Sequence, residues 1–143
     1  LLFPDDYINN ITERLNLYNK LSELKTEEEL QKYETDLIDR FGDLPTPAVD
    51  LLNSVRFKWL AISLGLERVI MKQRKMVGYF VADQESSFYQ SPTFSKVIQY
   101  AQNNSRLVKM KEKQTRNGLR LIITFEHITN INKALQSLSP VLI

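Results

Sequence analysis

The sequence predicts an α+β fold: three N-terminal helices, then hairpin–helix–hairpin–helix with a four-stranded, mainly antiparallel sheet covered by helices. Apolar residues recur at steps of three and four as far as Gly65. Beyond it, "LERVIMKQRKMVGYFVA" and the stretch from Leu107 to Phe125 are rich in β-branched and aromatic residues, and helical spacing returns after Pro92 and after Asn130. With 143 residues, of which 43% are hydrophobic, the chain has the composition of a globular domain rather than a disordered segment.

Apolar stripes predict the first two helices. The first is expected to begin just after Pro4 and to bury a face made of Ile8, Ile11, Leu15, Tyr18 and Leu21. In the second, Thr26 and Glu29 have the spacing of a capping box. Its expected buried stripe is Leu30, Tyr33, Leu37 and Phe41. Gly42 then ends the helix as a left-handed cap.

The third helix is expected to begin in "LPTPAVDLL", where Thr46 caps it and Pro47 takes the first helical position. Proline is tolerated there because its missing N–H has no partner inside the helix in any case. The apolar residues that continue this helix to Gly65 are Leu51, Leu52, Val55, Trp59 and Ile62.

Two hairpin–helix units are predicted after Gly65. The first hairpin turns at the polar segment 73–75, and Gly78 within its second strand suggests a bulge. Ser91 caps the next helix, with Pro92 at its first position. The second hairpin has Asn117-Gly118 in its turn region, and the last helix runs from about Asn130 to Pro140.

Residues 1–143 are expected to form a single domain, with a helical part at 1–65 and the two hairpin–helix units at 66–143. The chain begins "LLFPDDY" without an initiator Met, which suggests a piece of a longer polypeptide. It contains no cysteine, which excludes disulfides and thiolate metal sites and suits a reducing cytoplasm. No apolar run approaches about 18 residues, so no membrane span is expected.

Catalysis by this chain is not expected. Three of the four glycines serve as caps or turns and Gly78 lies in a strand, so none is left for a phosphate-binding loop. His127 is the only histidine, has no acidic cluster or cysteine around it, and is expected to be structural. The sequence therefore predicts no catalytic residue, no cofactor and no metal ion.

The charges are divided along the chain. Residues 1–50 carry 5 Lys+Arg and 12 Asp+Glu, a net −7, whereas residues 51–143 carry 14 and 5, a net +9. Basic residues concentrate on the two predicted hairpins: Lys72, Arg74, Lys75, Arg106, Lys109, Lys111, Lys113, Arg116 and Arg120. They suggest either a nucleic-acid-binding module or a solvated face that protects sheet edges. Tyr79, Phe80 and Phe125 are expected in the sheet core rather than in a stacking platform.

Two acidic residues lie near the C-terminal end of the second helix, where the helix dipole disfavours negative charge. At about 100° per residue, Asp39 is opposite the buried stripe and Asp36 is about 60° from Asp39, so both are expected to face solvent. One interpretation is an i,i+4 pair between Asp36 and Arg40, with Asp39 merely solubilising. The other is an acidic patch, together with Glu28, that binds a basic partner surface.

The segments "PDDYINNITERLNLY", "DLIDRFGDLPTPAVDLL" and "RFKWLAISLGLERV" resemble the C-terminal domain of bacterial transcription-repair coupling factor. The resemblance is specific over residues 4–71 and weaker beyond them. It implies a parent that is an ATP-dependent translocase on double-stranded DNA, displaces stalled RNA polymerase and recruits the excision-repair protein UvrA. The helicase motifs of that family lie outside this chain.

The same resemblance implies a role for the two acids. In the family, the C-terminal domain packs on the N-terminal UvrA-binding module of the parent chain and masks it. The acidic positions of the family's "[DE]LIDRF" motif correspond to Asp36 and Asp39, which would face arginines of the masked module. Arg40 would hold Asp36 in position. The expected function is thus a non-catalytic, autoinhibitory interaction domain, with UvrA and RNA polymerase as indirect partners; the alternative is nucleic-acid binding by the basic hairpins.

Overall fold

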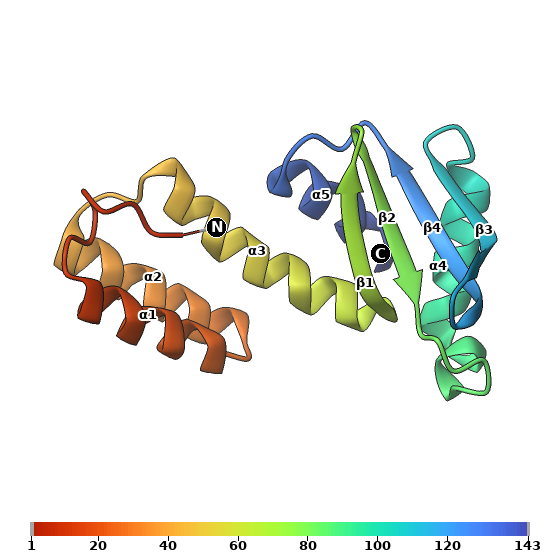
Figure 1. Ribbon diagram of the computed structural model, residues 1–143, viewed down its shortest axis with the longest axis horizontal. Coiled ribbons are helices and arrows are strands. Elements are labelled where there is room, and N and C mark those ends of the chain that lie inside the picture. Colours follow the sequence, from red (N-terminus) through yellow and green to blue (C-terminus); the bar gives the residue numbers. More distant parts are fainter. Residues whose placement is uncertain (1, 143) are drawn as a thin grey trace. The chain divides into compact units, whose positions relative to one another are not determined.

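The computed structural model describes residues 2–142, and their side chains as far as Val141 (Figure 1). The described residues form five α-helices, two short 3₁₀ helices and one four-stranded sheet, which confirms the predicted α+β fold. The chain divides into two compact units, Leu1–Arg56 and Phe57–Ile143, with the boundary inside the third helix. None of the helices within residues 2–142 combines the length and apolarity needed to cross a bilayer.

The first unit contains α1 (Ile11–Glu23), α2 (Glu27–Phe41) and the N-terminal part of α3 (Thr46–Ser63). Asn10 caps α1 by accepting from the Glu13 N–H. The capping box of α2 is confirmed: the Thr26 hydroxyl accepts from the Glu29 N–H, and the Glu29 carboxylate accepts from the Thr26 N–H at 3.1 Å. The buried residues of this unit are Phe3, Ile8, Leu17, Leu21, Leu30, Tyr33, Leu37, Ala48, Leu51 and Leu52.

Some residues that were predicted on buried helix faces are exposed or only half-buried. Helix α1 begins at Ile11, and both Ile11 and Leu15 are exposed. The buried residues of the helix are Leu21, as predicted, and Leu17, which was not predicted. Phe41 at the end of α2 is only half-buried; its ring lies 5.8 Å from that of Tyr7. Spacing alone placed these side chains on the correct helices but overestimated how deeply they are buried.

Corrections also apply to α3. Thr46 is its first residue rather than its cap, since the Ala48 and Val49 N–H groups donate to the carbonyl of Pro45. Within the second unit, α3 buries Phe57 and Ala61, whereas Trp59 is half-buried and Ile62 is exposed.

The second unit contains one antiparallel sheet in the order β1-β2-β4-β3. The strands are β1 (Leu66–Lys72), β2 (Lys75–Phe80), β3 (Val108–Thr115) and β4 (Gly118–Glu126). Gln73 and Arg74 both have positive φ, 53° and 64°, as a two-residue type I′ hairpin turn requires. Every strand pair is antiparallel, so the predicted "mainly antiparallel" sheet is entirely so.

Helices α4 (Pro92–Asn103) and α5 (Ile131–Leu138) pack on one face of this sheet (Figure 1). Ser91 caps α4 with Pro92 at its start, as predicted, and Asn130 caps α5. The core between helices and sheet contains Phe57, Ala61, Leu64, Leu66, Met76, Phe80, Val97, Ala101, Val108, Ile123, Phe125, Ile128, Ala134, Leu138 and Val141. Side chains alternate along a strand, so the residues between these core positions lie on the opposite, outer face.

Gly78 does not form the predicted β-bulge. Gly78 pairs regularly with Val69 and with Ile123, and the register shift lies on β1 between Leu66 and Arg68. A Cβ at position 78 would lie 2.9 Å from Leu66 Cδ2, so the glycine makes room for a neighbouring core side chain.

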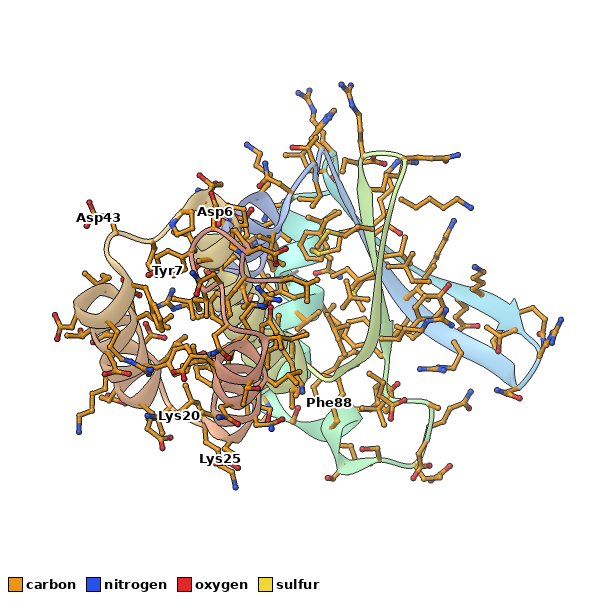
Figure 2. All side chains as sticks on the ribbon, turned by 60° about the vertical axis from the view of Figure 1, so that its left-hand side comes forward. Asp6, Tyr7, Lys20, Lys25, Asp43 and Phe88 are labelled. Carbon is orange, nitrogen blue, oxygen red and sulfur yellow. The ribbon has the colours of Figure 1, made fainter. Side chains whose placement is uncertain are left out.

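The sequence did not predict the short 3₁₀ helix η1 (Ser87–Gln90), which follows β2. It supplies Phe88 and Tyr89 to an aromatic cluster with Phe80 and Phe94, in which ring centroids are 5.1–6.1 Å apart. Phe88 projects from this segment in Figure 2. The cluster closes the end of the core next to Gly65.

Candidate functional site

The candidate site is the solvent-facing surface of α2, and its centre is Arg40. The Arg40 guanidinium lies 3.6 Å from the Asp36 carboxylate and also forms an ion pair with Glu13 of α1. It lies 4.9 Å from the centroid of the Phe41 ring. The hydrogen bond to Glu13 is the main reason that the pKa of Arg40 is raised. The interpretation that Asp36 pairs with Arg40 therefore has a geometric basis.

Asp39 differs from Asp36. It is exposed, and within residues 2–142 it makes no ion pair or side-chain hydrogen bond. It also lies in the last turn of α2, where the carbonyl groups at the helix end carry partial negative charge. Asp39 consequently gains nothing from its local surroundings.

Glu28 is exposed and unpaired among the described residues as well, but it is distant from the other acids. Eleven residues separate it from Asp39, which corresponds to about 20° around the helix and about 16 Å along it. Exposed Lys32 lies between them on the same side of α2. The structure thus brings Asp36, Asp39 and Arg40 together and leaves Glu28 at the opposite end of the helix.

The acids on the other flank of α2 are paired with Arg56 of α3. Arg56 Nε lies 3.0 Å from both carboxylate oxygens of Glu27, and Arg56 Nη2 is 3.7 Å from Glu34. Sequence reasoning missed this cluster and the Glu13–Arg40 pair, because their members are 22 to 29 positions apart and no local spacing connects them. With these acids paired, Asp39 and Glu28 are the carboxylates of α2 left for a partner once Glu29 is engaged in its capping box.

The α2–α3 corner positions the end of the acidic surface. Gly42 has φ +89°, which side chains rarely adopt, and its N–H donates to Ile38 O. The Tyr7 hydroxyl donates to the Gly42 carbonyl at 2.8 Å and fixes the corner from outside the helices. Figure 2 shows Tyr7 and Asp43 on this side of the first unit, with Asp43 directed outward.

The described residues contain no group of three or more His, Asp or Glu side chains arranged to hold a metal ion. His127 is exposed with φ 62°, in the turn after β4. A hollow of about 220 Å³ in the second unit is lined partly by Tyr89 and Arg120. The Tyr89 hydroxyl donates to Val81 O and Arg120 Nη2 donates to Phe80 O and Glu67, whereas the buried Nε of Arg120 has no hydrogen-bond partner among the described residues. We find no arrangement of reactive groups in this hollow.

Comparison with known proteins matches residues 1–91 to the family model of the TRCF domain. The transcription-repair-coupling factor of Escherichia coli K12 is 43% identical over 68 residues, which are 48% of this chain and 6% of that protein. The protein of the same name from Rickettsia bellii is 25% identical over 141 residues, 99% of this chain and 12% of its own length. The chain therefore spans about a tenth or less of the curated relatives that it matches.

A solved structure described as the C-terminal domain of transcription-repair coupling factor has the same fold. It aligns with a TM-score of 0.70 and 18% identity, covering 99% of this chain and 88% of the solved one. Since the family model matches well over half of the residues, the chain belongs to the TRCF domain family of transcription-repair coupling factors.

Proposed function

We propose that this chain is a non-catalytic regulatory domain that docks on the N-terminal UvrA-binding module of its parent chain and masks it. The observation that carries the proposal is Asp39, an exposed carboxylate that lacks a cationic partner among the described residues and opposes the dipole of its own helix. A partner surface with arginines would stabilise the charge that the domain itself does not. On this proposal UvrA and RNA polymerase are partners of the parent, in the cytoplasm, and meet this domain only indirectly.

Arg40 gives the surface a fixed shape. Because its guanidinium bonds Glu13 of α1, it stays beside Asp36 whether or not a partner is bound. A partner arginine would then meet an oriented Asp36 rather than a freely rotating one, which lowers the entropic cost of binding. Charged pairs of this kind contribute mainly specificity and orientation to an interface.

The absence of an activity of its own is part of the proposal. In the hollow beside Tyr89, the Tyr89 hydroxyl and Arg120 Nη2 are already hydrogen-bonded, and the sequence contains no phosphate-binding loop. We therefore expect ATP turnover by the parent to depend on segments outside this chain.

Titration of the 143-residue chain against the N-terminal module of its parent tests the proposal. Asp36→Ala/Asp39→Ala should weaken this binding about tenfold or more, as expected for close charge pairs across an interface. Asp39→Lys should weaken it further by adding repulsion. In the full-length parent the same variants should raise the affinity for UvrA, because the masked site opens.

The matched control is Asp6→Ala/Glu23→Ala, which removes two exposed acids that have no ion pair in residues 2–142 and lie outside α2. This variant should bind the module as the unmodified chain does. No binding of the unmodified chain, or an equal loss in the control, would contradict the proposed docking surface.

A further inference from the structure

The outer face of the sheet in the second unit is strongly basic. Its cations are Arg68, Lys72, Lys75, Lys109, Lys111, Lys113 and Arg120, which the strand register places on the side opposite the core. Glu126 and Glu67 are the acids beside them, so seven cations and two acids give a local net charge of +5. Nitrogen-tipped side chains project from the strands in Figure 2.

Most of these cations have no acidic partner. Within the described residues, Lys75 pairs with Glu126 at 3.4 Å and Arg120 with Glu67 at 3.2 Å, whereas the remaining five make no ion pair. Arg68, Lys72, Lys109 and Lys111 are exposed. The strand spacings place the cations over about 14 Å across the sheet and about 13 Å along β3. A surface of this kind attracts a polyanion rather than a single charge.

The centre of the face is covered by its own cations. Tyr79 points away from the core, yet it is only 8% exposed. Arg68, Lys113 and Arg120 lie 5.6–5.8 Å from its ring centroid, and Lys113 Nζ donates to its hydroxyl at 3.0 Å. Tyr79 is thus buried, as expected from the sequence, but on the outer face of the sheet rather than in the core under the helices. The ring organises lysine and arginine side chains and is not free to stack on a base.

The composition of the basic face indicates which class of macromolecule it binds. A protein interface is depleted in lysine and needs an apolar centre, but this face has five lysines and its central residues Tyr79 and Ile122 are covered. Single-strand binding proteins stack bases on exposed aromatic rings, which this face lacks among its described residues. The remaining candidate partner is a nucleic acid that is recognised through its closely spaced phosphates. A duplex has a higher charge density than a single strand, so the duplex is the favoured partner.

We propose that the outer sheet face of the second unit binds the phosphate backbone of double-stranded nucleic acid without reading its sequence. Lys109 and Lys111 on β3 and Lys72 on β1 would contact phosphates directly. Lys113, Arg68 and Arg120 are held around Tyr79 and keep the centre of the face positive. The site lies in the second unit and shares no residue with the docking surface proposed on α2.

Fluorescence anisotropy of a labelled duplex of about 20 base pairs, titrated with the 143-residue chain at about 50 to 200 mM salt, tests the site. Lys72→Glu/Lys109→Glu/Lys111→Glu should weaken binding at least tenfold at about 100 mM salt. The dependence of log K on log salt should flatten by about 0.9 for each phosphate that the variant no longer neutralises, or about 2.7 in all. The side chains of these three lysines make no hydrogen bond or ion pair in residues 2–142, so the fold should survive. Circular dichroism checks this, and the matching triple Gln variant replaces any Glu variant that unfolds.

The control is Lys58→Glu/Lys96→Glu/Lys133→Glu, which changes the net charge equally at exposed lysines on α3, α4 and α5. It should weaken binding by no more than about threefold. A decrease in affinity equal to that of the sheet-face variant would overturn the proposal in favour of a net-charge effect. Tighter binding of a single strand, or equal binding of poly-glutamate at the same charge, would overturn the choice of duplex nucleic acid. So would the absence of duplex binding at about 50 mM salt.

Discussion

Gly65 joins α3 to β1 under the ring of Phe88. It has φ +80°, and a Cβ at this position would lie 2.3 Å from Phe88 Cζ. Its carbonyl also accepts from the Val81 N–H at 3.0 Å, which ties the start of β1 to the end of β2. Two separate requirements, a left-handed backbone and a close ring, therefore act on one residue.

We predict that Gly65→Ala lowers the free energy of unfolding by about 2 to 4 kcal/mol, the sum of left-handed strain and overpacking. The two causes can be separated in a Phe88→Ala background, where the ring is gone and the same substitution should cost only about 1 to 2 kcal/mol from strain. Denaturant unfolding of the unmodified chain, the two single variants and the double variant measures the coupling. An equal cost of Gly65→Ala in both backgrounds would show that Phe88 does not restrict the site.

At the scale of elements, α1 and α2 are joined by Tyr33. This side chain is 3% exposed, and its hydroxyl donates to the Leu17 carbonyl of α1 at 2.8 Å. Burial raises the pKa of Tyr33 well above its ordinary value of 10.0, with smaller contributions from Tyr18 and Asp36. The folded state therefore retains a proton that the unfolded state releases above about pH 10.

This linkage predicts a loss of stability in alkali. Above about pH 10 the unfolded state binds fewer protons at Tyr33 than the folded state, so the free energy of unfolding falls as the pH rises. Tyr33→Phe should remove that part of the slope and should cost about 1 kcal/mol at pH 7 through the missing hydrogen bond. Unfolding by urea at pH 7, 10 and 11 provides the comparison. Because the pKa values of Tyr7 and Tyr89 are also raised, part of the slope should remain. An unchanged slope in Tyr33→Phe would exclude Tyr33 as its source.

The elements were largely predictable, whereas the buried faces were predicted correctly for α2, α4 and α5 but only in part for α1 and α3. Caps at Thr26 and Ser91 and periodic apolar residues are local signals, which is why the helices and hairpins were correctly predicted. Burial depends on which neighbour each face meets, so Leu15 was wrongly expected to be buried, and Tyr79 is buried as expected but on the outer face of the sheet. The segment of η1 lacks periodicity, and nothing in its sequence indicated that Phe88 would cover Gly65.

In the candidate site, too, local contacts could be predicted from the sequence and contacts between helices could not. The i,i+4 spacing was sufficient to predict the Asp36–Arg40 pair. The ion pair between Arg40 and Glu13 depends on how α1 packs beside α2, and the cluster of Arg56 with Glu27 depends on α3. Only these long-range pairs reveal that Asp39 and Glu28 remain without cationic partners among the described residues of α2.

At the scale of the whole molecule, the two units carry opposite charge. Residues 1–56 contain 6 Lys+Arg and 12 Asp+Glu, a net −6, and residues 57–143 contain 13 and 5, a net +8. The acidic surface of α2 and the basic sheet face belong to different units and share no residue. Substitutions at sites without shared partners usually have independent effects on free energy.

We therefore predict that the two surfaces can be inactivated separately. Asp36→Ala/Asp39→Ala should weaken binding to the N-terminal module and leave duplex affinity within about threefold, since the two acids belong to the first unit and share no partner with the sheet face. Lys72→Glu/Lys109→Glu/Lys111→Glu should do the reverse. The chain with all five substitutions should show both effects at the size measured in the separate variants. The same two titrations, run on all four proteins at one salt concentration, provide the test. Weaker binding of the lysine variant to the N-terminal module would show that the basic face belongs to the docking surface. Tenfold tighter duplex binding by the acidic variant would show that net charge, rather than a local site, governs that binding.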